Sequence, residues 1–352
     1  EAHLPRLLLY HPEYADAMLD QLWDAIPTDE TIWDFAVTVC ELINHHANDR
    51  IVESNGGQGR WTEVRRSIVR LLERGLDPET RPPTFLLERV RAVLLCLIDD
   101  PDPDTETDHP PEGFFGHNDP SSIAINAVRP RALHCLIRYT GFLAGIDEEA
   151  TQNFRKPGPR RWDSHIRDTL SRKLDRSQDP SWSVHSIYGR DLSWLNWLDA
   201  TWVQENLDRI FPEDEDTSSV AYFLAAWDSY VGHHNWWPVG LDNLRSRYVK
   251  AIEYLRRGLK TAMEAPRSPQ QMLVVHVTID YVRSDYDLHD PTGPDNLLGL
   301  LYQEVPNASD DVSWALAQLL RNSAAYAARR WSRIREVWEW RTSIVEATEE
   351  PE

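Results

Sequence analysis

The chain has 352 residues, enough for roughly two or three ordinary domains or for one extended repeat array. Its 57 acidic and 37 basic residues give a net charge of −20, which argues against general binding to DNA or RNA because like charges repel. The strongest basic cluster, RKPGPRRW at 155–162, is interpreted as a solvated linker. No apolar run approaches the roughly 20 residues that cross a bilayer, so we expect a cytoplasmic chain without a membrane segment.

Amphipathic helices separated by short breaks recur along the whole chain. Thr28 and Thr84 stand where N-cap residues are expected, and Gly75 stands where a helix C-cap is expected. The three cysteines lie within apolar helical patterns and form no CxxC pair, which indicates reduced, buried thiols. The helices predicted from apolar periodicity are 28–48, 60–77, 82–100, 121–145, 162–176, 182–188, 192–211, 218–232, 241–260, 268–283, 295–304, 310–322 and 324–346.

Residues 272–282, MLVVHVTIDYV, are the one ambiguous segment because they are rich in β-branched side chains. Helical neighbours on both sides favour a buried helix there, and no segment alternates with period two for long enough to demand a sheet. Helix pairs recur about every 40 residues without a strict sequence repeat. The sequence therefore predicts an all-α fold, a degenerate HEAT/TPR-like α-solenoid of antiparallel helix pairs.

Three breaks interrupt the helical pattern and indicate domain organisation. The long acidic loop 99–120 is expected to be solvated in its acidic half, while Phe114 and Phe115 must be buried locally or offered to a partner. At 211–219 the candidate N-caps are Asp216, Thr217 and Ser218. The linker RKPGPRR separates an N-terminal helical-repeat part, 1–150, from a Trp-rich C-terminal helical-repeat part, 160–352.

The sequence holds no motif at a spacing that enzyme chemistry requires. There is no HExxH, GxxxxGK[ST], GxSxG or strand-linked GxGxxG pattern. Pairs of carboxylates are so frequent in this acidic chain that they do not indicate an active site. The adjacent pairs His45/His46 and His233/His234 diverge by about 100° on a helix, which suits one metal ion poorly. We therefore assign no catalytic residue, no metal site and no cofactor.

Fifteen tryptophans are an excess for this length, and most are expected in the core between helices. Trp331 and Trp338 are seven residues apart and so share a helix face. The best candidates for contact with a protein partner are in HHNWWP at 233–238. This segment comes directly after a predicted helix and ends at a proline. With Phe114 and Phe115, these candidates are His233, His234, Asn235, Trp236 and Trp237.

DPSSIAINAVRPRALHCLIRY (119–139) resembles a motif of large bacterial antiphage defence proteins of the STAND (NACHT- or Avs-like) type, which end in HEAT-like repeats. YGRDLSWLNWLDATWVQENLDRIFP (188–212) and SSVAYFLAAWDSYVGHHNWWPVGLDNLRSRYVKAI (218–252) resemble further motifs of the same proteins. Pro130 stands where the family has glycine and should kink its helix. The matching residues to which we give structural roles are Asn126, Arg129, His134, Arg138 and Trp227.

From the residues alone, Asn126 is expected to bond a neighbouring helix's backbone and Arg129 to reach a carboxylate, while Ile123, Ala127 and Ile137 face the core. The resemblance implies that the chain is the sensor portion of a larger protein, binds a viral protein and carries no catalysis itself. The missing initiator Met also predicts a fragment. Two alternatives remain open, an all-α hydrolase with a Trp-lined acidic cleft in a closed ring of helices, and a purely structural or oligomerisation scaffold.

Overall fold

The structure is a computed structural model, and every regular element among the residues it describes is a helix. This confirms the predicted all-α class for that part of the chain. The described residues are 8–25, 30–48, 58–76, 80, 82–109, 119–144, 162–214, 216–233, 241–259, 268–283, 288, 296–305, 309–322 and 324–349.

The helices correspond closely to the predicted periodic segments. The predicted boundary between the two parts of the chain falls at 145–161, outside the described residues. The first elements are α2 (Pro12–Ala25), α3 (Glu30–Asn48), α4 (Gln58–Gly75), the 3-10 helix η2 (Thr84–Leu86), α5 (Leu87–Leu97), α6 (Thr105–Asp108), α7 (Pro120–Asn126), α8 (Val128–Leu143), α10 (Ser164–Lys173) and α11 (Trp182–Arg190). They are followed by α12 (Leu192–Leu198), α13 (Ala200–Ile210), α14 (Thr217–His233), α15 (Leu241–Arg256), α16 (Pro269–Arg283), α17 (Leu297–Glu304), α18 (Ser309–Asn322), α19 (Ala324–Arg329) and α20 (Trp331–Glu349).

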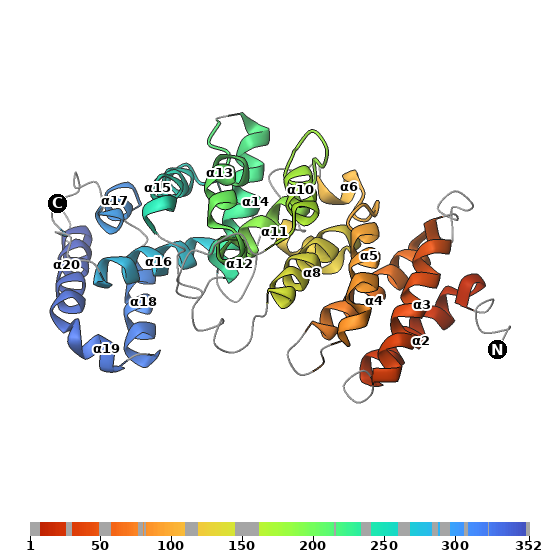
Figure 1. Cartoon of the computed structure of the whole chain (residues 1–352). Coiled ribbons are helices and arrows are strands. Elements are labelled where there is room, and N and C mark those ends of the chain that lie inside the picture. The colour runs from red at the N-terminus through yellow and green to blue at the C-terminus, as the bar shows by residue number, and fades with distance from the viewer. Residues whose placement is uncertain are drawn as a thin grey trace.

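The helices follow one another across an elongated molecule in chain order, and the two termini lie at opposite ends (Figure 1). Packing is mostly between helices close in sequence: α2 lies on α4, α3 on α5, α14 on α16, α15 on α17 and α16 on α18. The ambiguous segment 272–282 lies within α16 and is buried along most of its length, which confirms the helical interpretation. Asp216 accepts the N–H of Ser219 and so caps the start of α14, as predicted.

The region predicted as one kinked helix at 121–145 is two helices instead. Ala127, between α7 and α8, is extended at φ −99° and ψ 156°. Pro130 therefore lies in the first turn of α8, where its missing N–H costs no helical hydrogen bond. The expected kink at Pro130 is replaced by a break at Ala127, which leaves Ile123, Ala127 and Ile137 buried as predicted.

Two predicted cap residues have other roles. Thr84 opens η2 rather than capping the helix that follows, and the residue that precedes α5, Leu86, makes no side-chain cap. Gly75 ends α4 but does not adopt a positive φ; the ring of Trp33 occupies the space that a Cβ would need. Gly75 is therefore explained by close packing and not by a left-handed turn.

The acidic segment 99–109 lies against four helices, although its acidic half was expected to be solvated. Asp100 is buried with Arg65 of α4, whose Nε lies 2.5 Å from Asp100 Oδ2. Arg66 donates from Nε and Nη2 to the two oxygens of Asp102 at 3.0 and 2.9 Å. Lys173 of α10 lies 2.9 Å from a carboxylate oxygen of Asp99.

Two carboxylates of this segment also satisfy the free N–H groups at helix starts. Asp102 accepts the N–H of Val128 at 2.8 Å, at the first residue of α8. Asp108 is buried and accepts the N–H groups of Trp182 and Ser183 at the start of α11. Negative charge at a helix N-terminus is stabilising. The prediction of a solvated segment is therefore wrong for Asp100 and Asp108, which join α4, α8 and α11.

Gly189 lies at the contact between α11 and α14. A Cβ built at Gly189 would collide with the backbone of Ala226, which has no flexible end that can yield. We expect Gly189→Ala to lower the free energy of unfolding by about 2–3 kcal/mol, because two backbones must move apart. The comparison is Gly258→Ala, where the space is open and only the positive φ of 71° opposes a side chain. Denaturant titration measures both, and a smaller loss at Gly189 than at Gly258 would contradict this packing.

Candidate functional site

The predicted partner-binding segment begins at the C-terminal end of α14. There His233 is exposed, and its Nδ1 lies 3.0 Å from the carbonyl oxygen of Ser229, to which it must donate. Partial desolvation of the ring by the surrounding protein, followed by the positive charge of Arg190, lowers the pKa of His233, so its ring is neutral at pH 7. The other predicted contact residues, His234, Asn235, Trp236, Trp237, Phe114 and Phe115, lie outside the described residues.

His134 of α8 lies between two carboxylates from different elements. Its Nδ1 is 2.6 Å from Oδ2 of Asp191, the residue between α11 and α12, and both side chains are buried. Its Nε2 is 3.7 Å from Oε1 of Glu73 on α4. A carboxylate bonded to one ring nitrogen fixes the orientation of the imidazole. His134 thus connects α4, α8 and the α11–α12 junction.

Two arginines of α8 balance the charge of Glu73. Arg131 donates from Nε to Oε2 of Glu73 at 2.8 Å, and Arg138 Nη1 lies 3.6 Å from Oε1. The charges of Asp191 and His134 both act on the ring of His233, so the end of α14 borders this group. We call Glu73, Arg131, His134, Arg138 and Asp191 the His134 cluster. It contains two residues of the family resemblance, His134 and Arg138, and His134 lies near His233, the first residue of the predicted recognition segment.

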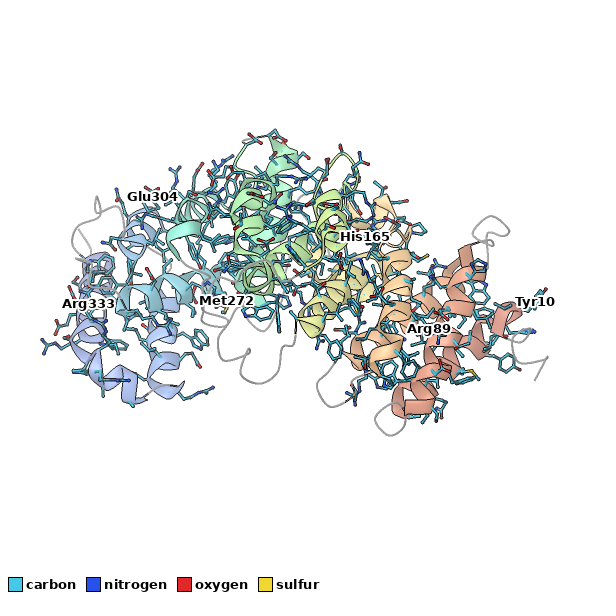
Figure 2. The ribbon with its side chains drawn as sticks, in the orientation of Figure 1. Tyr10, Arg89, His165, Met272, Glu304 and Arg333 are labelled. Atoms are coloured by element: carbon cyan, nitrogen blue, oxygen red, sulfur yellow. The ribbon has the colours of Figure 1, made fainter. Side chains whose placement is uncertain are left out.

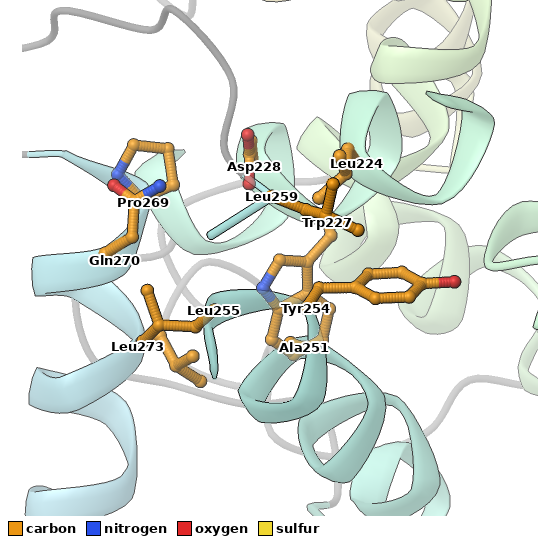
Figure 3. A pocket seen from close by; sticks show the side chains of 10 residues that line it. All are labelled: Leu224, Trp227, Asp228, Ala251, Tyr254, Leu255, Leu259, Pro269, Gln270 and Leu273. Carbon is orange, nitrogen blue, oxygen red and sulfur yellow. The ribbon is translucent and has the colours of Figure 1, made fainter. Parts of the chain in front are cut away.

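A hollow lies on the other side of the same helix end, between α14, α15 and α16 (Figure 3). Its cavity volume is about 20 Å³, which is room for roughly one water molecule. Its walls include Trp227, Tyr254, Leu255 and Leu273, and its acidic group is Asp228.

Trp227 is buried, in agreement with its predicted structural role. Its ring packs edge-on against Tyr248 with the centroids 4.8 Å apart, and it stacks with Phe223 at 5.8 Å. Edge-on and offset ring pairs stabilise a core beyond the area they bury. Trp227 is therefore fixed in place, and only one side of it borders the hollow.

The two remaining residues of the resemblance motif act differently from expectation. Asn126 donates from Nδ2 to the carbonyl of Ser122 on its own helix, so the expected bond to a neighbouring helix is wrong. Arg129 donates to the carbonyl oxygens of Asp100 and Pro103 at 2.9 and 3.2 Å. Its Nε also lies 3.5 Å from a carboxylate, that of Asp179, as predicted.

Among the tryptophans that the structure describes, the exposed ones lie on α20. Trp331 and Trp338 share a face of that helix as predicted, and their side chains are 53% and 50% exposed. The sequence analysis placed the recognition surface at 233–238 with Phe114 and Phe115, and it expected most of the other tryptophans in the core. The exposure of Trp331 and Trp338 could have been anticipated from the arginines that surround them, because charged neighbours at helical spacing indicate a solvated face.

Sequence reasoning missed Glu73, Asp191 and Asp179, the carboxylates that the motif residues contact. Asp191 lies 57 residues from its partner His134, and no local pattern joins them. The sequence around them offered no signal, because Glu73 and Asp191 each stand beside an arginine, Arg74 and Arg190, and not inside an apolar run.

The cysteines of the described chain are free thiols, two of them buried and Cys96 half-buried. Burial raises the pKa of Cys40 to about 12, so this thiol is neutral and a poor nucleophile at pH 7.

No group of three metal-ligating side chains occurs among the residues described, and no helix in that part of the chain is long and apolar enough to span a membrane. We also compared the chain with protein-family models, curated proteins and solved structures. None of these comparisons produced a match.

Proposed function

We propose that this chain is a non-catalytic helical-repeat module that recognises a protein partner in the cytoplasm. We further propose that it is a HEAT/TPR-like solenoid and the target-sensing region of a larger bacterial antiphage defence protein of the STAND type. Support for the solenoid comes from the open row of helices with termini at opposite ends (Figure 1) and from packing between helices close in sequence.

The observation that carries the recognition proposal is the position of the end of α14. His233, at the end of α14, lies near His134 and Asp191 of the His134 cluster, and the same helix borders the hollow through Trp227. Interface hot spots are enriched in Trp, Tyr and Arg and are rimmed by polar groups. The sequence that continues from this point is HNWWP, so two tryptophans follow directly on a helix end that combines apolar and charged neighbours.

The hydrolase alternative draws less support from the described residues. An all-α toroid closes its helices into a ring and holds two carboxylates about 5–10 Å apart in a cleft. Here the helices form an open row, and Asp100, Asp102 and Asp191 are engaged by Arg65, Arg66 and His134. Carboxylates paired in this way hold helices together.

The test is a pull-down from phage-infected cells with the purified chain as bait. Wild type is expected to retain a viral protein, and Trp236→Ala/Trp237→Ala is expected to lose it. Trp331→Ala/Trp338→Ala is the matched control, because it removes two exposed tryptophans at the far end of the molecule. Equal retention by wild type and Trp236→Ala/Trp237→Ala would refute the assigned surface. If neither the wild-type chain nor either variant retains a viral protein, the scaffold alternative is favoured.

A further inference from the structure

One aromatic face lies at the C-terminal end of the molecule. We define the C-terminal face as Arg329, Trp331, Arg335 and Trp338, all of them exposed. Trp331, Arg335 and Trp338 recur at spacings of four and three residues and so lie on one side of α20. Val337 is buried on another side of the helix. Large exposed aromatic side chains grouped in this way are typical of an interaction surface.

The C-terminal face is locally basic in a chain whose net charge is −20. Residues 329–341 contain five arginines and two glutamates, a local charge of +3. Arg330 donates to a main-chain carbonyl of α16, and Arg333 stacks 4.0 Å from the centre of a tyrosine ring of that helix. Arg335 Nε is 3.5 Å from a glutamate one turn away on the surface. Arg329 and Arg335 thus remain at the surface, where they can meet acidic groups.

A second aromatic face lies at the opposite end, and its charge has the opposite sign. We define the N-terminal face as Tyr10, Tyr14, Asp20 and Asp24, exposed side chains that are spread around the start of the chain and helix α2; both tyrosines are more than half exposed, at 63% and 55%. Helix α2 has four acidic residues and no lysine or arginine. Figure 2 shows Tyr10 at one end of the molecule and Arg333 near the other.

We propose that copies of this chain associate head to tail, with the N-terminal face of one copy on the C-terminal face of the next. Opposite charges attract across such a contact, whereas pairing two identical faces would bring like charges together. Arginine and tryptophan on one side and tyrosine on the other also favour cation–π and ring contacts. Because the two faces differ, the contact is heterologous and leaves a free face at each end of every assembly.

The expected association is weak and depends on concentration. Contacts between two helix faces lie at the low end of interface size, below about 1,200 Å² in total. Wild-type chain is therefore expected to form a series of dimers and longer assemblies as its concentration rises. Sedimentation velocity over a concentration series measures this, and a wild-type chain that remains monomeric at every concentration overturns the proposal.

Charge reversal provides the sharper experiment. Arg329→Glu/Arg335→Glu disables one face, and Asp20→Lys/Asp24→Lys disables the other, so each variant alone is expected to be monomeric. A mixture of the two retains one intact face of each kind. It is expected to associate, because the intact acidic face of one variant meets the intact basic face of the other, and the two reversed faces are again opposite in charge.

The control matched to Asp20→Lys/Asp24→Lys carries the same change of net charge on the surface between the ends. Asp168→Lys/Asp214→Lys replaces two exposed acidic residues and is expected to associate as wild type does. Trp236→Ala/Trp237→Ala is also expected to associate, which separates this proposal from the recognition proposal. A mixture that stays monomeric overturns head-to-tail pairing, as does association by either disabled variant alone. Circular dichroism establishes that each variant is folded.

Discussion

Arg65→Met is expected to lower the free energy of unfolding by about 3–5 kcal/mol, because it leaves the buried Asp100 without its positive partner. Burial raises the pKa of Asp100 even with Arg65 present, which indicates that the ion pair does not fully offset the cost of removing this carboxylate from water. Without Arg65 that cost is uncompensated. Urea denaturation at pH 7 measures the difference.

The control for Arg65→Met is a second variant on the same acidic segment. Arg172 pairs with Asp99 at 3.0 Å, but both side chains are about half exposed. Arg172→Met is therefore expected to cost less than about 1 kcal/mol. The double variant Arg65→Met/Asp100→Asn keeps the bond from the Asp102 N–H and should recover most of the loss. Equal losses for the two single variants would show that the segment is not buried.

Acidification is expected to weaken the fold through His185, by roughly 3 kcal/mol between pH 6.5 and pH 4. Burial lowers the pKa of His185 from 6.5 to about 4, and the bond to the carbonyl of Ile210 opposes this shift only in part. Between these two pH values the unfolded chain binds a proton that the folded chain does not. Stability from the neutral ring is therefore present above pH 6.5 and is lost as the pH falls towards 4.

Two substitutions at His185 separate titration from hydrogen bonding. Gln can still donate to the Ile210 carbonyl, which lies 2.8 Å from His185 Nε2, but it does not titrate. His185→Gln is expected to lose less stability than wild type on acidification. His185→Leu is expected to share this smaller pH dependence, while being less stable than His185→Gln at pH 7. Thermal unfolding from pH 7 to pH 4 tests both, and parallel curves for wild type and His185→Gln would contradict the role of His185.

Local patterns predicted most of the helices because period and caps are local properties. Apolar spacing located α14 and α16, and Asp216 marked the start of α14. Where the bounds of a helix depend on a partner distant in the sequence, the prediction from local patterns was wrong. The break at Ala127 lies where the N–H groups of Val128 and Arg129 reach Asp102, which stands about 26 residues earlier in the chain.

The candidate site was predictable only in part for the same reason. The motif residue His134 was singled out correctly, but its contacts with Glu73 and Asp191 join positions about 60 residues apart. The acidic segment looked solvated because its charge is visible in the sequence, whereas the arginines of α4 that face it are not adjacent to it. Composition shows that charges are present, and only the packing of helices shows which of them are paired.

Affinity for the captured protein tests the recognition proposal most directly. Isothermal titration of that protein into the wild-type chain should give a defined dissociation constant. Trp236→Ala/Trp237→Ala should weaken it at least about 30-fold, the effect of losing roughly 2 kcal/mol at an interface hot spot. Trp331→Ala/Trp338→Ala should leave it unchanged. An unchanged affinity for Trp236→Ala/Trp237→Ala would contradict recognition through the segment that follows α14.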